Sequence, residues 1–303
     1  MEENKKKVLI LGGTGFLGYH VIRAFSESGF ELGVMLHNKT DDLSIPYDGY
    51  KTFTGDIAKP ASIERVINEF RPDIIIHLVG IMREKPPQKT YKKLHVEGTQ
   101  NIVEAVKKAG IPDEKIIYVS ALGADLNGST EYYRTKAQAE EIIKNSGLVY
   151  AIFRPAIIFG WRAHFTNRLR FYARILPFIP VISKNTFKLE PVAADTVADV
   201  IVQAANGAGN NKTYNVVGPE FLTARELTER LREKMGSVKP IVRIPIFIAR
   251  IATMLGSLGL PTPVTKPELV MLLSGDEGTN DELKKDFEVK DIYFDPINEY
   301  PLY

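Results

Sequence analysis

The sequence predicts an α/β protein with a Rossmann-type, doubly wound parallel sheet and a smaller mixed C-terminal substrate region. Two observations support this prediction. Short apolar runs alternate with amphipathic helical segments over the first half of the chain, and a glycine-rich turn joins the first run to the first helix. Alternation at this spacing implies right-handed crossovers between parallel strands. After Phe159 the alternation ends, and helices, prolines and short strands mix without a repeat.

The strands are predicted from short apolar runs, which are typical of strands buried on both faces of a parallel sheet. They cover residues 8–11, 32–36, 50–54, 73–79, 115–120 and 148–153. The helices are predicted from apolar residues that recur on one helical face. They cover residues 16–28, 62–70, 91–109 and 132–146.

We predict two regions: a dinucleotide-binding domain at residues 1–160 and a smaller substrate or partner region at residues 161–303. Within the second region a helix is expected over 195–206, and a strand near 213–218 is expected to return to the main sheet. Thr223 is predicted to begin another helix, because Glu226 three residues later completes a capping box.

Composition excludes several kinds of site and partner. The chain has 303 residues, a net charge of +2 and no cysteine, which excludes disulfides and zinc–thiolate sites. The five histidines are scattered, so no metal site is predicted. The near-neutral net charge and the lack of a helix-turn-helix or other nucleic-acid-binding motif argue against nucleic acid as a partner. Without a secretory signal or an apolar run of about 18 residues, we expect a soluble cytoplasmic protein.

The strongest local signal is the turn between the first strand and the first helix. It has the G-x-G-x-x-G spacing of a dinucleotide-binding fingerprint, and its residues are Gly12, Gly13, Thr14, Gly15, Phe16, Leu17 and Gly18. Glycines permit the tight turn and the close approach of a pyrophosphate, which then lies at the N-terminus of the helix. We therefore predict that this turn binds a nicotinamide dinucleotide.

The end of the second strand bears on which dinucleotide binds. An NAD site usually places Asp or Glu there, about 20 residues after the glycines, to bind the ribose hydroxyls. Here the chain reads His37, Asn38 and Lys39, without an acid. His37 and Lys39 are suited to a 2′-phosphate, so NADP(H) is favoured over NAD(H); the alternative is that both are ordinary solvated loop residues.

These features resemble the short-chain dehydrogenase/reductase superfamily, in its extended or atypical branch related to NAD-dependent epimerases and dehydratases. The resemblance covers about residues 7–218 and implies further cofactor contacts. These fall at Asp56, Ile57, Leu78, Val79, Gly80, Pro155 and Ile157. One segment of this pattern usually begins with asparagine, and His95 stands there instead.

A narrower likeness gives the alternative function. The segments 118–124 and 133–136 are similar to relatives of the NADPH-binding accessory subunit of respiratory complex I. That resemblance implies a non-catalytic NADPH-binding subunit or redox sensor that docks on a membrane-associated electron-transfer complex. The leading hypothesis remains an oxidoreductase or a nucleotide-sugar epimerase or reductase.

The candidate catalytic residues follow from the resemblance. Tyr132 and Lys136 lie four residues apart and therefore share one face of the predicted helix. In the family, the lysine binds the nicotinamide ribose and its charge assists the tyrosine, which transfers a proton to or from the substrate oxygen. Ser120 is the only hydroxyl directly after the fifth strand, although Ala121 is an alternative substrate-facing position. Glu140, later on the same helix, is expected on a solvated face.

Two stretches without acidic residues mark the second region. They span residues 142–189 and 234–267, and they combine basic with apolar and aromatic side chains. This composition suits an anionic small-molecule substrate, an acidic membrane surface or a partner subunit, with contacts expected through 161–189 and 240–267. The alternative is a helical cap whose apolar side packs on the sheet. The sequence leaves the oligomeric state open.

Overall fold

The structure is a computed structural model of the whole chain. It describes residues 5–38, 49–111, 114–182, 188–257, 264–274 and 278–296. Lys39 lies outside the described residues. No helix among the described residues has both the length and the apolar character needed to cross a membrane.

A seven-stranded parallel sheet forms the centre of the molecule, in the order β11-β6-β5-β4-β1-β2-β3. Its strands are β1 (Lys7–Leu11), β2 (Glu31–Leu36), β3 (Tyr50–Thr54), β4 (Ile74–His77), β5 (Lys115–Val119), β6 (Val149–Pro155) and β11 (Lys212–Val216). The carboxyl ends of β1 and β4 meet at Leu11 and His77, beside the glycine turn. The predicted fold is confirmed, and the strand expected near 213–218 pairs in parallel with β6.

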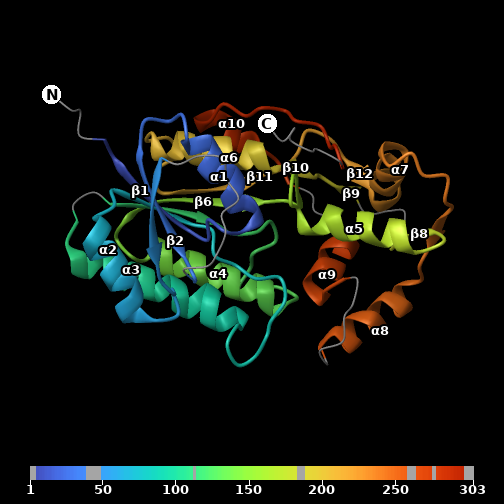
Figure 1. Cartoon of the computed structure of the whole chain (residues 1–303), viewed down its shortest axis with the longest axis horizontal. Helices are drawn as coiled ribbons and strands as arrows, with labels where there is room; N and C mark the ends of the chain where they lie inside the picture. The colour runs from blue at the N-terminus through green and yellow to red at the C-terminus, as the bar shows by residue number, and fades with distance from the viewer. Residues whose placement is uncertain are drawn as a thin grey trace.

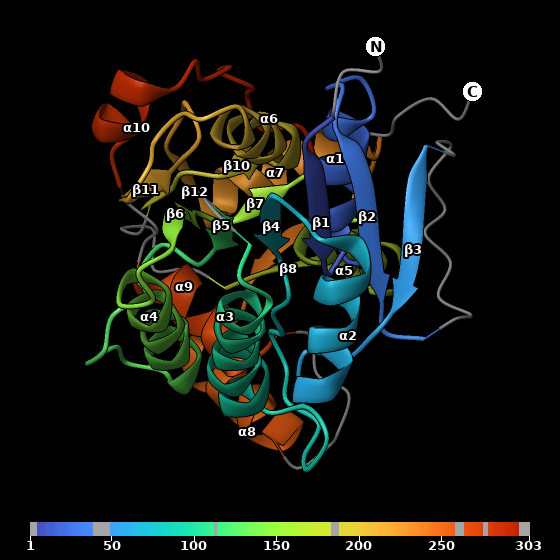
Figure 2. The same ribbon diagram turned by 90° about the vertical axis from the view of Figure 1, so that its left-hand side faces the viewer.

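Helices cover both faces of this sheet (Figure 2). One face carries α1 (Phe16–Phe25) and α6 (Ala194–Ala205), and the other carries α2 (Pro60–Phe70), α3 (Gly98–Ala109) and α4 (Glu131–Lys144). Alternate residues of β1 enter the two cores: Val8 and Ile10 pack on the first face, and Leu9 and Leu11 on the second. The central strands β1, β2, β4 and β5 read as largely apolar runs because both of their faces are buried, whereas the edge strands β3 and β11 include exposed lysines.

Two predicted helix boundaries differ from the structure by more than two residues. The helix expected over 91–109 begins as a π-helix, Lys92–Glu97, and becomes α-helical only at Gly98. The helix expected to continue to residue 28 ends at Phe25, where the hydroxyls of Ser26 and Ser28 donate hydrogen bonds to backbone carbonyls of the last turn. Apolar periodicity does not distinguish these local hydrogen-bond patterns from a continuous α-helix.

The second region packs beside the carboxyl ends of the strands (Figure 1). Its helices are α5 (His164–Ile175), α7 (Ala224–Lys234), α8 (Ile246–Ser257) and α9 (Lys266–Ser274). The short strands β7 (Ile158–Phe159), β8 (Ile179–Val181), β9 (Lys188–Leu189), β10 (Val192–Ala193), β12 (Leu222–Thr223) and β13 (Ile241–Arg243) pair two by two. The predicted capping box of Thr223 and Glu226 is present at the start of α7. The last helix, α10 (Asp281–Asp286), returns to β11, where Tyr214 donates a hydrogen bond to Asp286.

Candidate functional site

The glycine turn brings the start of α1 against the ends of β1 and β4. A Cβ on Gly18 would lie 2.5 Å from the carbonyl oxygens of both Gly12 and Gly13, so only glycine fits there. Gly12 itself has φ +90°, in the left-handed region. Gly15 caps α1 without a side-chain hydrogen bond to the first turn. The first N–H groups of this helix are therefore left to an anion, and the turn fits the pyrophosphate of a dinucleotide.

The other predicted cofactor residues divide into those that share one cavity and those that do not. A cavity of about 220 Å³ lies at the carboxyl ends of β4, β5 and β6, and its lining includes Phe16, Leu78, Gly80, Pro155 and Ile157. Val79 lies beside the turn, since a Cβ on Gly12 would approach its backbone nitrogen to 3.1 Å.

The remaining predicted contacts are not among the residues that line this cavity. His37 and Asn38 are exposed directly after β2, and Thr14 and Leu17 are half-buried in the turn and the first turn of α1. The carboxylate of Asp56 accepts a hydrogen bond from the backbone of Ala58.

Ile57 anchors the loop after β3. Its side chain is buried, and its carbonyl accepts a hydrogen bond from Asn101.

Tyr132, Lys136 and Ser120 all line the 220 Å³ cavity, together with Ala121. Helix α4 presents Tyr132 and Lys136 from one face, and Ser120 and Ala121 follow the end of β5. The structure therefore brings the three predicted catalytic residues together. It also places both alternatives for the substrate-facing position, Ser120 and Ala121, at the cavity wall.

Lys136 is a buried cation held by the strand beneath it. Its ammonium donates a 2.9 Å hydrogen bond to the carbonyl of Val119 and lies 4.8 Å from the centre of the Tyr118 ring. Burial lowers the pKa of Lys136 to about 7, and the carboxylate of Glu140 opposes that change. The charge on Lys136 therefore depends on what surrounds it near neutral pH.

Ser120 has an unused hydroxyl. Its side chain is buried, and its Oγ has no hydrogen-bond partner among the described residues. A buried hydroxyl without a partner carries a free-energy cost of about 1–3 kcal/mol. A substrate oxygen in the cavity would remove that cost by accepting the hydrogen bond.

Tyr132 is set within an aromatic cluster that includes His95. The rings of Tyr91 and His95 contact it edge-on, with centroids 5.8 and 5.6 Å from its own. His95 accepts a hydrogen bond from the backbone N–H of Ile81 at Nε2 and contacts Thr135 through Nδ1 at 3.0 Å. Burial and the nearby charge of Lys136 lower the pKa of His95 well below its usual value, so the ring is neutral.

His95 therefore connects the loop after β4 to α4. In the sequence, His95 is notable only because it replaces the usual asparagine. The histidines are scattered along the chain, so nothing in the sequence indicated that His95 would link these two elements.

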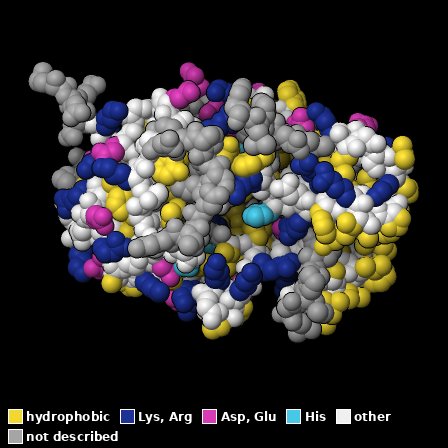
Figure 3. All heavy atoms as spheres, viewed as in Figure 1, with side chains coloured by type: hydrophobic (Ala, Val, Ile, Leu, Met, Phe, Trp, Pro, Cys, Tyr) yellow, Lys and Arg dark blue, Asp and Glu magenta, His cyan; other side chains and the backbone are white. Residues whose placement is uncertain are grey.

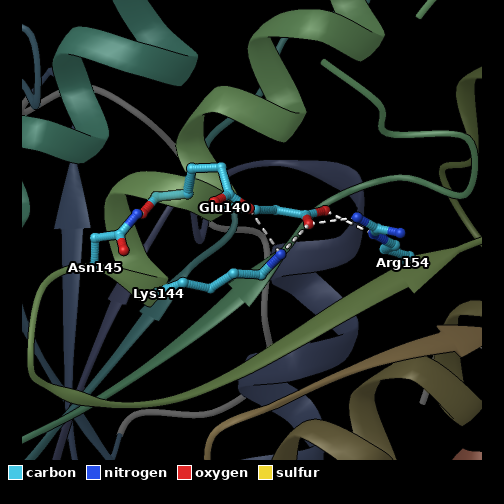
Figure 4. Close-up of polar contacts among 5 residues, drawn as sticks. Glu140, Lys144, Asn145 and Arg154 are labelled. Carbon is cyan, nitrogen blue, oxygen red and sulfur yellow. Dashed lines mark hydrogen bonds and ion pairs between the residues drawn. The ribbon is translucent and has the colours of Figure 1, made fainter. Parts of the chain in front are cut away.

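Glu140 corrects one expectation. The sequence placed it on a solvated helix face, but its side chain is buried and accepts two hydrogen bonds from Arg154, of 2.8 and 2.6 Å (Figure 4). Lys144 reaches the same carboxylate at 3.5 Å from the next turn of α4 (Figure 4). The expectation was wrong because Arg154 lies on β6, and only the tertiary fold brings it to α4.

Residues of the second region close the cavity, and the sequence did not single them out as site residues. They are His164, Phe165, Glu268 and Leu272, from α5 and α9. Glu268 forms an ion pair with Arg168 and accepts hydrogen bonds from Thr265. The acid-free composition of residues 142–189 was the available signal. Any carboxylate that pairs with Arg168 must come from outside this stretch.

Comparisons with known proteins agree with this geometry. The family model described as "NAD dependent epimerase/dehydratase family" matches residues 8–217. The chain is 25% identical to "NADH dehydrogenase [ubiquinone] 1 alpha subcomplex subunit 9, mitochondrial" of Arabidopsis thaliana, over 97% of this chain and 75% of that protein. It is 28% identical to the decarboxylating sterol-4-alpha-carboxylate 3-dehydrogenase of Saccharomyces cerevisiae, over 71% of this chain and 70% of that protein.

Among solved structures, the fold is similar to that of the UDP-glucose 4-epimerase of Thermotoga maritima. The TM-score is 0.66 at 22% identity, and the match covers 79% of this chain and 85% of the other.

Proposed function

Because the chain belongs to the NAD-dependent epimerase/dehydratase family, an extended branch of the short-chain dehydrogenases/reductases, we propose that it is an NADP(H)-dependent oxidoreductase whose proton-transferring residue is Tyr132. One observation carries the proposal: Tyr132, Lys136 and Ser120 line a single cavity at the carboxyl end of the sheet. In doubly wound folds the ligand binds at this end of the strands.

Each part of the site has a separate role in the proposed reaction. The glycine turn and the first turn of α1 hold the pyrophosphate, and the bound nicotinamide supplies or accepts the hydride. Tyr132 gives a proton to the substrate oxygen during reduction and removes it during oxidation. Ser120 donates a hydrogen bond to the same oxygen and orients it. Lys136 places a positive charge on the face of α4 that carries Tyr132, which favours the ionised form of the tyrosine.

NADP(H) rather than NAD(H) is proposed from the end of β2. His37 follows that strand directly and is exposed, and no Asp or Glu is present at this point to bind the ribose hydroxyls. An imidazole there meets a 2′-phosphate without the charge repulsion that a carboxylate would cause.

The second candidate function is that of a non-catalytic NADPH-binding subunit that docks at a membrane. The surface of the second region supports binding to a membrane. Exposed apolar side chains gather at the end of the molecule that carries α5 and α8 (Figure 3). They are Phe171, Ile175, Phe247, Ile248, Ile251, Met254 and Leu255. Five of these lie on one face of α8. We propose that this surface, the α5–α8 surface, binds an anionic bilayer.

Charge complementarity supports a bilayer as the occupant of the α5–α8 surface. Arg174, Arg243 and Arg250 are exposed on the same elements or beside them, within stretches of sequence that contain no acid. Apolar side chains flanked by cations are typical of helices that lie in a membrane interface. The cytoplasm remains the proposed compartment, and binding to the cytoplasmic face of a membrane is compatible with either candidate function.

The replacement Tyr132→Phe tests the catalytic proposal. It removes one hydroxyl and keeps the ring among Tyr91 and His95, so NADPH affinity should stay within about twofold. Reduction of a panel of aldehydes and ketones by NADPH should become at least about 100-fold slower, the usual contribution of a general acid. The measurement is NADPH oxidation followed by absorbance, alongside calorimetric titration of NADPH.

Tyr133→Phe is the matched control, because Tyr133 is equally buried but packs against Gly123 and Gly128 outside the cavity. It should keep wild-type rates. Equal rates for Tyr132→Phe and the wild type would remove Tyr132 from the proposed role and favour the non-catalytic candidate.

A further inference from the structure

A second cavity adjoins the catalytic one. It has a volume of about 300 Å³ and lies between α5, α7, α8 and α9. Phe165, Glu268 and Leu272 line both cavities, so the two spaces share a wall and meet at these side chains. The second cavity, here called the apolar cavity, is therefore the direct neighbour of the cavity that Tyr132 and Ser120 line.

The lining of the apolar cavity offers few polar partners to a ligand. Its walls are built from aliphatic and aromatic side chains such as Leu169, Phe178, Leu227 and Ala249. The hydroxyl of Thr228 is already used, because it donates a 2.7 Å hydrogen bond to the carbonyl of Ala224. A polar group placed there would lose its hydrogen bonds to water without replacement.

The charged groups in its lining are paired with each other. Arg168 and Glu268 form an ion pair at the junction with the catalytic cavity. Glu268 is further held by the backbone and hydroxyl of Thr265 at 2.8 and 2.7 Å. These contacts hold the pair at the wall, where it marks the boundary between the polar and the apolar space.

Tyr132 also lines a third cavity of different character. Its volume is about 500 Å³, and its lining includes Arg83, Lys85, Arg134 and Lys266 against Glu84 and Glu131. Four basic and two acidic side chains leave it with a positive balance. Tyr132 therefore lines both this basic cavity and the catalytic cavity, and the catalytic cavity in turn adjoins the apolar cavity.

We propose that the substrate is an amphipathic molecule with a long alkyl or isoprenoid chain. The chain occupies the apolar cavity, the reacting oxygen lies at Ser120 and Tyr132, and an acidic or polar end group faces the basic cavity. The chemistry of this substrate rests on the proposed function, but its binding does not. A nucleotide sugar does not suit the apolar cavity, because the lining offers few donors to match its hydroxyls and phosphates.

The binding test uses cis-parinaric acid, a fluorescent polyene fatty acid whose emission rises in apolar surroundings. The wild-type protein should bind one molecule at micromolar concentration. Octanoate, decanoate and dodecanoate should displace it with increasing strength, about fourfold for each added methylene, as expected for transfer of a chain from water to an apolar site. UDP-glucose should not displace it. Displacement by UDP-glucose, or affinity independent of chain length, would overturn the proposal.

Variants locate the binding site. Ala249→Phe, in the buried wall of the apolar cavity, should weaken parinaric acid binding at least tenfold. Ala252→Phe fills the same cavity from a less buried position. It replaces Ala249→Phe as the test variant if Ala249→Phe does not fold. Ala61→Phe, an exposed alanine of α2, and Phe171→Ser, an exposed residue of α5 outside the cavity lining, should leave binding unchanged.

The outcomes separate this proposal from the catalytic one. Unchanged binding in both cavity variants, or loss in Phe171→Ser, would place the fatty acid on the surface and overturn the inference. Tyr132 does not line the apolar cavity, so Tyr132→Phe should keep the rise of affinity with chain length, and failure of catalysis in that variant leaves the fatty-acid result intact. Conversely, absence of any fatty-acid binding in a protein that oxidises NADPH would overturn only the substrate class.

Discussion

Lys136 is the residue whose charge the site must control. It is almost fully buried, which favours its neutral form, but Glu140 lies one turn further along α4 and favours its charged form. Arg154 in turn fixes Glu140 with two short hydrogen bonds. The ion pair between Arg154 of β6 and Glu140 of α4 therefore bears on the charge of Lys136, and the sequence positions of Arg154 and Glu140 gave no indication of this.

The pKa of Lys136 gives a testable pH dependence of stability. Its usual value of 10.5 is lowered to about 7 in the folded protein. Between these two pH values the unfolded chain binds the extra proton, so the free energy of unfolding rises with pH by up to roughly 1.4 kcal/mol per unit. Urea denaturation of the cofactor-free protein should show this rise relative to Lys136→Met between pH 7 and 10.

The matched control for that series is the exposed Lys107 of α3. Lys107→Met and the wild type should differ by a constant amount over the same range. A stability difference between the wild type and Lys136→Met that does not change with pH would contradict a lowered pKa for Lys136.

At the residue scale, the sequence was sufficient to bring Tyr132, Lys136 and Ser120 to one cavity, because their positions follow from the order of the elements, and their catalytic roles stay a prediction. Two of them share a helix face by their spacing, and the third follows a strand of apolar residues. Glu140 and His95 could not be assigned in this way. Their roles depend on Arg154 and Thr135, whose positions beside them result from tertiary packing.

At the scale of elements, the glycine turn tolerates little change. A methyl group on Gly18 would meet two backbone carbonyl oxygens at 2.5 Å, and backbone cannot yield as a side chain can. Gly18→Ala should therefore displace α1 from β1 and weaken NADPH binding at least about tenfold, since the helix N-terminus moves away from the phosphates.

Gly110→Ala is a suitable control for the glycine turn. Gly110 has φ +59° and open space around its Cβ position, so alanine should cost about 1 kcal/mol of stability through backbone strain alone. NADPH affinity should not change. Equal NADPH affinity of Gly18→Ala and the wild type would contradict binding at this turn.

Most elements of the sheet were predictable because the central strands are buried and read as apolar runs, whereas the edge strand β3 has exposed polar residues. The π-helical start at Lys92–Glu97 was not, since its residues keep an ordinary apolar spacing. Short strands were expected in the second region, but their bounds and their pairing were not predicted. Several of them have only two residues and exist only through their partners.

For the whole molecule, the acid-free stretches of the sequence indicate the segments that form α5 and α8, but not the apolar cavity between them. That cavity combines α5, α7, α8 and α9, which are separated by up to about a hundred residues of sequence. No local sequence pattern predicts a cavity formed by helices that lie so far apart in the chain. The same helices carry the α5–α8 surface, so a long-chain substrate and a bilayer surface are consistent with each other.

Membrane binding by the α5–α8 surface can be measured by sedimentation with vesicles. The protein should bind vesicles of phosphatidylglycerol and phosphatidylcholine in equal parts, and binding should weaken with added salt. Ile251→Asp should reduce it at least about fivefold, because a carboxylate replaces an exposed apolar contact and opposes the anionic surface. Leu126→Asp, at an exposed leucine before α4, should have no effect. Equal binding of Ile251→Asp would rule out α8 as the contact.

The most direct test of the account is calorimetric titration of NADPH and NADH into the purified protein. We expect one NADPH to bind at micromolar or lower concentration and NADH to bind at least about tenfold more weakly. His37→Asp should reverse this preference, because a carboxylate binds ribose hydroxyls and repels a 2′-phosphate. If neither nucleotide binds at micromolar concentration, the glycine turn does not hold a dinucleotide and the proposed chemistry has no hydride donor.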